Sequence, residues 1–357
     1  GGATRINSQG LIETVADGVS RLNYPLIDGV VKGCPSHILE PTATNSINYS
    51  EDFSNSVWTR SSSGTGITPI ITSNYAISPD GTQNATRVQF DNGSGTALSD
   101  FTYLQTVHNN ISIASSSIWI KSNDSNNYDI ALRGTNFVVC NVTPKWQRFE
   151  LNNQINEIVL QLILRGTYGT SNNADILIYG AQAENNSFTT SYIPNYGTAL
   201  GVTRSAETAI AAGDASTFND SEGVLMLEAT FKQLSHNNLI TLTNGQVGNI
   251  IQLFANTNDK KELRFYLSFG GTNIAPSTIV AINEIEEYNK ISIKYKSGST
   301  KVYINGFLKL NITTAFNGAS FDRLHLSQYN ESLPFVGSIK QLQYFDSALN
   351  DSDLETL

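Results

Sequence analysis

Hydrophobic and polar residues alternate most clearly in Lys290–Leu310, which reads KISIKYKSGSTKVYINGFLKL. Apolar or aromatic side chains take every second position from Ile291 to Tyr295, and the alternation resumes after a Ser-Gly-Ser break and runs to Asn305-Gly306. A period of two marks a half-buried strand, and Asn-Gly is the strongest short-range hairpin signal. The pattern therefore predicts an antiparallel meander of adjacent hairpins.

Six further runs with strand-like patterning lie between residues 46 and 203. They are Thr86–Phe90, Ser117–Lys121, Tyr128–Arg133, Arg148–Leu151, Ile158–Arg165 and Ala174–Glu184. Turn formers such as Asp80-Gly81 separate them, and short strands between such turns are typical of a β-sandwich or jelly roll. No long helical periodicity appears, so the pattern predicts an all-β protein.

The same patterns divide the chain into two antiparallel β-sandwich (jelly-roll) domains with an extended N-terminal segment. Residues 1–45 have weak periodicity and several turn formers, and we expect an extended lead-in or adaptor there, with one or two strands. Residues 46–203 are predicted to form the first sandwich and residues 204–357 the second. A length of 357 residues is enough for two domains with full cores.

Charge and cysteine content narrow the possible partners. The net charge is −9, which argues against binding nucleic acid because phosphates attract basic surfaces. No run of 18 apolar residues occurs, so we expect no membrane insertion. Cys34 and Cys140 stand far apart without ligand-like spacing; one bridge between them is possible, but two buried free thiols are the favoured interpretation.

Several motifs resemble carbohydrate-binding families. SSSIWIKS, VTPKWQRFEL and ADILIYGAQAE in the first sandwich resemble the carbohydrate-binding-module type of jelly roll, in matching order. The VYING turn and the tail GSIKQLQYFDSALNDSDLETL resemble the late strands of the concanavalin A-like (laminin G-type) lectin sandwich. These resemblances imply a glycan-binding protein.

A second resemblance concerns the biological setting. Ala3–Pro25 and Cys34–Trp58 resemble a pattern of bacteriophage tail-fibre and tail-tip proteins, and Phe188–Glu207 resembles the linker that follows such modules in phage proteins. The resemblance implies a virion adhesin in the phage tail, extracellular when it acts. It would recognise a host surface polysaccharide, contact other tail proteins and form a homotrimer, as tail fibres commonly do.

Alternation also indicates which side chains could hold a sugar. If Ile118, Ile130 and the leucines of Ile158–Arg165 build the core, another set projects from the opposite faces of these strands. That set is Trp119, Arg133, Gln161 and Arg165. Aromatic planes stack on sugar rings, and fork-shaped donors hold hydroxyls or carboxylates, so the set suits a glycan. The alternative is that these faces pack on a second sheet and that Trp119 belongs to the core.

Calcium is implied only by the resemblance to carbohydrate-binding modules, in which a structural calcium often joins an early loop to the last strand. The matching residues here are Glu51 or Asp52, together with Asp175. Carboxylate oxygens suit calcium, but no contiguous calcium loop occurs. Ordinary solvated acidic residues in turns are the alternative.

Catalysis has one local candidate, the segment INEIEEYN with Glu284, Glu286 and Glu287. Glu284 and Glu286 have the spacing of paired acids on one strand, and glycosidases need two carboxylates. The segment lies directly before a predicted strand, where an exposed turn is expected, so we favour a solvated turn and a protein that is not an enzyme. Two alternatives to an adhesin remain: a structural tail protein, and a depolymerase or an accessory part of one.

Overall fold

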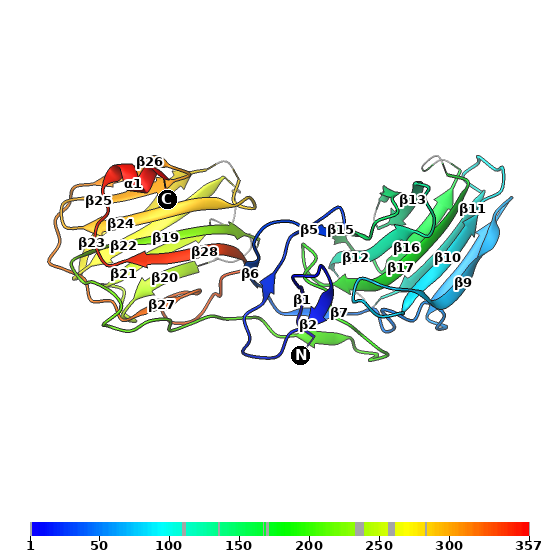
Figure 1. Cartoon of the computed structure of the whole chain (residues 1–357), viewed down its shortest axis with the longest axis horizontal. Coiled ribbons are helices and arrows are strands. Elements are labelled where there is room, and N and C mark those ends of the chain that lie inside the picture. Colours follow the sequence, from blue (N-terminus) through cyan, green and yellow to red (C-terminus); the bar gives the residue numbers. More distant parts are fainter. Residues whose placement is uncertain are drawn as a thin grey trace. The chain divides into compact units, whose positions relative to one another are not determined.

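The computed structural model describes residues 2–108, 112–134, 136–166, 168, 171–232, 239–255, 261–282 and 284–356. Contacts between residues divide the chain into two units (Figure 1). Unit 1 comprises Gly1–Cys34 and Thr42–Ser205, and unit 2 comprises Pro35–Pro41 and Ala206–Leu357. Residues 2–34 thus pack with the first sandwich instead of forming a separate lead-in, and Pro35–Pro41 belongs to the second.

Unit 1 contains a sandwich of two five-stranded antiparallel sheets. The sheet named here the β12 sheet has the order β15 (Gln147–Ile155), β12 (Ile113–Ser122), β17 (Asn173–Glu184), β10 (Ala85–Asp91) and β9 (Ile67–Ala76). The sheet named here the β16 sheet has the order β14 (Phe137–Val142), β13 (Tyr128–Arg133), β16 (Val159–Arg165), β11 (Phe101–Val107) and β8 (Trp58–Ser63).

The core of unit 1 lies between these sheets and follows from the alternation along their strands. Ile118 and Ile120 from β12 meet Ile130 and Leu132 from β13, and all four side chains are fully buried. The same period places the intervening residues on the outward surfaces of the two sheets. A ligand can bind only to an outward surface that no other segment of the chain covers.

Unit 1 also contains short strands outside its two five-stranded sheets. They are β1 (Thr4–Ile6), β2 (Ile12–Thr14), β3 (Leu22–Asn23), β4 (Leu26–Ile27), β5 (Val30–Val31), β7 (Ala43–Asn45) and β18 (Val202–Arg204). β1 pairs with β2, β4 with β5, and β7 with β18, all antiparallel. The buried Arg21 guanidinium donates to Thr4 O at 2.8 Å and to Ser191 Oγ at 2.7 Å. These bonds attach the N-terminal segment to the end of the sandwich domain.

Unit 2 is a second sandwich with its own core. One sheet runs in the order β26 (Phe307–Ile312), β25 (Thr300–Ile304), β24 (Asn289–Lys296), β19 (Glu222–Phe231), β28 (Gly337–Phe345) and β6 (Ser36–Leu39). The other runs β23 (Thr272–Ala281), β22 (Glu262–Phe269), β21 (Ile250–Ala255), β20 (Leu239–Thr243) and β27 (Arg323–His325). The predicted meander is confirmed in β24, β25 and β26, with Asn305 and Gly306 at positive φ in the second turn.

The structure confirms the predicted fold class, an almost all-β chain of antiparallel sandwiches. The short α1 (Asp351–Thr356) is the one α-helix among the described residues, and no described helix has the length and apolarity to cross a membrane. The cysteine prediction needs one correction, because both thiols are free but only Cys140 is buried. Cys34 is exposed, at the point where the chain leaves unit 1.

Candidate functional site

The outward surface of the β16 sheet, called here the open face, gathers aromatic, amide and guanidinium side chains. Leu104, Leu132 and Leu162 point into the core, so their neighbours along β11, β13 and β16 point outward. The open face is defined by Phe101, Tyr103, Gln105, Asp129, Arg133, Phe137, Gln161 and Arg165.

A row of polar side chains crosses the middle of the open face. Arg133 of β13, Gln161 of β16 and Gln105 of β11 are cross-strand partners in register. Gln161 Nε2 donates to Gln105 Oε1 at 2.6 Å. Gln161 is only 3% exposed, and its Oε1 has no hydrogen-bond partner among the described atoms. A buried acceptor without a partner is costly, so this oxygen is suited to a donor from a ligand.

Two arginines and two rings form a cluster at one end of that row. Phe137 stacks on Tyr168 with 4.5 Å between ring centroids and 20° between planes. The Arg165 guanidinium carbon lies 5.3 Å from the Phe137 centroid and 5.6 Å from the Tyr168 centroid. The Arg133 guanidinium carbon lies 6.0 Å from the Phe137 centroid. All four side chains are partly exposed, so the cluster offers ring surface and cationic donors to solvent together.

The structure does not bring Trp119 to the open face. Its strand, β12, belongs to the other sheet, where Trp119 is 7% exposed and packs with Ile12, Tyr179 and Tyr192. Ile12 comes from β2, so the N-terminal segment covers the outward surface of the β12 sheet at this point. Trp119 is thus a packing residue, as the alternative interpretation of the sequence had it. Arg133, Gln161 and Arg165 do lie on one surface.

Sequence reasoning missed the residues that complete the open face. β11 and β14 were not among the expected strands, so Phe101, Tyr103 and Phe137 had no assigned position. The alternation of FTYLQTV could have indicated a strand, but its inward positions include Thr102 and its outward positions are aromatic. Tyr168 lies beyond the end of β16, joined to Arg165 by an isolated bridge that no period-two pattern marks.

The residues expected to hold calcium make separate sets of contacts. Both oxygens of the Asp175 carboxylate accept from the Arg87 guanidinium, at 2.8 and 2.6 Å. Asp52 accepts from Ser54 in its own turn. Among the described residues no group of three or more Asp, Glu, His or Cys side chains is placed to hold a metal ion. These separate contacts show no shared ion site among the described residues, and calcium stays a prediction for the chain.

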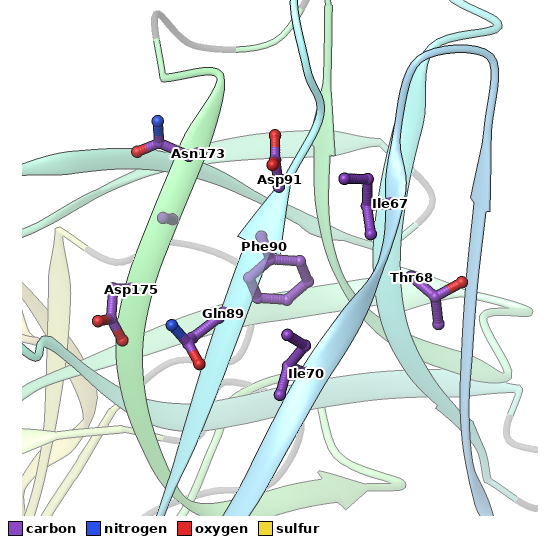
Figure 2. Close-up of a pocket in the computed structure, with 9 residues that line it drawn as sticks. Ile67, Thr68, Ile70, Gln89, Phe90, Asp91, Asn173 and Asp175 are labelled. Atoms are coloured by element: carbon purple, nitrogen blue, oxygen red, sulfur yellow. The ribbon is translucent and has the colours of Figure 1, made fainter.

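Asp175 instead lines a shallow pocket of about 340 Å³ on the outward surface of the β12 sheet. Figure 2 shows its side chain on β17 beside Gln89 of β10, with Ile70 of β9 on the far side of Gln89. Asp91 and Asn173 form the next row along the same strands. The Arg87–Asp175 ion pair shows why Asp175 is fixed here, since two parallel hydrogen bonds hold a carboxylate in one geometry.

Glu51 lies in a cluster of tyrosines and amides. Its carboxylate accepts from Tyr192 Oη at 2.9 Å, from Tyr179 Oη at 3.2 Å and from Asn84 Nδ2 at 3.1 Å. Burial raises the pKa of Glu51 above its usual value, although the tyrosine hydrogen bonds oppose the shift. The nearby Asp80 carboxylate shares Tyr179 and Asn84 as donors. This cluster fixes the first loop of the sandwich against β17.

The candidate acids for catalysis lie in the expected turn. Ile285, Glu286 and Glu287 form the turn before β24, so Glu284 and Glu286 do not alternate on one face of a strand. The turn is tied by Asn289, whose Nδ2 donates to Glu284 O at 2.8 Å and to Glu287 O at 2.9 Å. The predicted turn is confirmed, but of its three acids only Glu287 is exposed, and Oε1 of Glu284 is buried without a partner among the described atoms.

No protein-family model and no curated protein matches the sequence. Among solved structures, the CBM40 of the Ruminococcus gnavus IT-sialidase is similar with 15% identity and a TM-score of 0.34, over 42% of this chain and 95% of that chain. The heptameric SAP-like pentraxin from Limulus polyphemus is similar with 13% identity and a TM-score of 0.33, over 41% and 73%.

A putative carbohydrate binding protein from Bacteroides ovatus has 12% identity and a TM-score of 0.32, over 71% of this chain and 78% of that chain. Similarities of this size do not assign a function.

Proposed function

We propose that this chain is a non-catalytic adhesin, part of a bacteriophage tail fibre or receptor-binding component, and that it binds a bacterial surface polysaccharide through the open face of unit 1. The observation that carries the proposal is the cluster of Phe137, Tyr168, Arg133 and Arg165 beside the unsatisfied oxygen of Gln161. Rings take the C–H faces of sugars, and the polar groups take hydroxyls and fix orientation.

The place in a phage tail is supported by sequence alone, through the resemblance of Ala3–Pro25 and Cys34–Trp58 to tail-fibre and tail-tip proteins. Contacts with other tail proteins and assembly as a homotrimer belong to the same proposal. A trimer would present three copies of the open face, and linked copies of a weak site raise avidity without any new contact.

The test is the retention of the purified chain on immobilised bacterial surface polysaccharides. The unchanged chain is compared with two variants, each of which shortens one side chain of β14 to alanine. Phe137→Ala removes the central ring of the open face. Val138→Ala, the matched control, truncates an exposed side chain that points to the other side of β14. We expect the unchanged chain and Val138→Ala to be retained equally and Phe137→Ala to bind about tenfold more weakly, the value of a lost ring contact of roughly 1.4 kcal/mol.

Three other results would contradict the proposal. Equal retention of both variants would remove the open face as the binding site. No retention on any polysaccharide, together with tight binding to another tail protein, would establish the structural alternative. Release of new reducing ends during the incubation would establish the depolymerase alternative, which Glu284→Gln and Glu286→Gln would then test.

A further inference from the structure

The two guanidinium groups of the open face have no acidic partner within the described part of the chain. Neither Arg133 nor Arg165 forms an ion pair with a described carboxylate, although the chain carries 31 acidic residues and 22 basic ones. Arg165 donates from Nη2 to Leu98 O at 2.9 Å, and its Nε is buried without a partner. In an acidic protein, two unpaired arginines beside one ring are available to an external anion.

The acidic groups nearest in sequence to this cluster are held in other ways. Asp129, on the open face, accepts from Asn141 Nδ2 at 3.0 Å and lies four residues from Arg133, about 13 Å along β13. Asp100 precedes β11, and its two carboxylate oxygens accept from the backbone amides of Thr65 and Ala97. No ion pair between described residues joins Asp100 or Asp129 to either guanidinium group.

The neighbouring Gln161 oxygen defines the second requirement for a ligand. It is an acceptor without a partner, so an anionic oxygen cannot satisfy it and a hydroxyl can. Arg133 is the cross-strand partner of Gln161, which places cationic donors and this acceptor on adjacent strands. A ligand that satisfies both carries an anionic group and a hydroxyl on one small scaffold, with an apolar surface for the Phe137 ring.

We infer that the open face selects an acidic sugar, an inference that rests on the glycan-binding function proposed above. The carboxylate of this sugar lies between Arg133 and Arg165, and a hydroxyl of the same or the adjoining sugar donates to Gln161 Oε1. The planar guanidinium matches a carboxylate with two parallel N–H donors, and a guanidinium held against a ring keeps those in-plane donors available. The substrate class is thus a polysaccharide that contains uronic or other carboxylated sugars.

The test is an NMR titration of the full chain with small probes, observing the arginine Nε–H signals and the backbone amides of β13 and β16. The probes are sodium glucuronate, sodium galacturonate, glucose, sodium acetate and sodium phosphate, at constant ionic strength. We expect the two uronates to shift the signals of the open face at concentrations about tenfold lower than glucose or acetate, because each of those supplies half of the recognised groups.

Matched variants locate the effect. Arg133→Gln should weaken glucuronate binding about tenfold, as should Arg165→Gln. Arg60→Gln is the matched control, because Arg60 lies on β8 of the same sheet but on the core-facing side, opposite Leu104. It should leave glucuronate binding unchanged. Asp129→Asn, which removes a negative charge from the face, should strengthen uronate binding. Arg133 and Arg165 are assayed separately so that a folding defect in one does not decide the result.

The outcomes separate this inference from the function on which it rests. Equal shifts with glucose and glucuronate would overturn the acidic-sugar inference and leave glycan binding standing. Stronger shifts with phosphate than with either uronate would overturn it in favour of a phosphorylated ligand. The absence of shifts with every probe would overturn it as well, and retention on the polysaccharide panel would then decide the glycan-binding function independently.

Discussion

In unit 1 the two outward sheet surfaces carry similar residues and differ in what lies over them. On the β12 sheet, Trp119 and Tyr179 are buried beneath Ile12 of the N-terminal segment. On the β16 sheet, Phe137 and Arg133 remain partly exposed. Aromatic side chains on an outward sheet surface therefore mean packing in one case and a binding surface in the other, and the N-terminal segment makes the difference.

The largest expected effect comes from the covered surface. Trp119→Ala should lower the free energy of unfolding of unit 1 by about 3–5 kcal/mol, because a buried indole is replaced by a cavity. Urea unfolding followed by circular dichroism measures the loss. Trp146→Ala is the matched control, since Trp146 is only partly buried against the same cluster, and its loss should be clearly smaller. A Trp119→Ala variant as stable as the unchanged chain would mean that the surface is not covered in solution.

A pH effect is expected next, beside the same covered surface. Burial raises the pKa of the Glu51 carboxyl in the folded chain above the value near 4.5 of the unfolded chain. Folding then favours the protonated form, so the contribution to stability is complete below about pH 4.5 and is lost as the pH rises through the raised pKa. Glu51→Gln should remove this loss.

The measurement is the difference in unfolding free energy between the unchanged chain and Glu51→Gln, from pH 4 to pH 8. Asp80 gives the contrast, because its pKa is lowered from 3.8: its contribution to stability is constant from pH 4 to pH 8 and is lost only at lower pH, as the pH falls through the lowered pKa. A difference that grows in favour of the unchanged chain above pH 4.5 would contradict the burial of Glu51.

A smaller effect on stability is expected in the pocket on the outward surface of the β12 sheet. Asp175→Asn breaks a bidentate pair with Arg87 whose side chains are each 24% exposed, so the loss should be about 1 kcal/mol. Asp91→Asn, in the same pocket but bonded to a backbone amide of its own turn, should cost less (Figure 2). Thermal unfolding of the two variants side by side checks the order, and the reverse order would show that Arg87 has another partner in solution.

The sequence predicted the direction of side chains better than their surroundings. Alternation correctly placed Leu132 inward and Arg133 outward, because period two is a local property of one strand. The burial of Trp119 depends on Ile12, more than a hundred residues away, and no local pattern carries that contact. β11 escaped prediction because its inward Thr102 is polar while its outward Phe101 is aromatic, which inverts the expected signal.

The smallest effect on stability, and the sharpest contrast with Trp119, is expected from Arg133→Gln. Arg133 is partly exposed and has no ion pair with a described carboxylate, and its guanidinium carbon lies 6.0 Å from the centroid of the Phe137 ring. Its loss should therefore change the unfolding free energy by no more than about 0.5 kcal/mol. Its effect on glycan retention should nevertheless be large. A substitution that weakens glycan retention without lowering the unfolding free energy identifies a ligand-binding residue, whereas one that lowers both identifies a packing residue. A loss of stability comparable with that of Trp119→Ala would place Arg133 in the packing class and make the two outward surfaces alike.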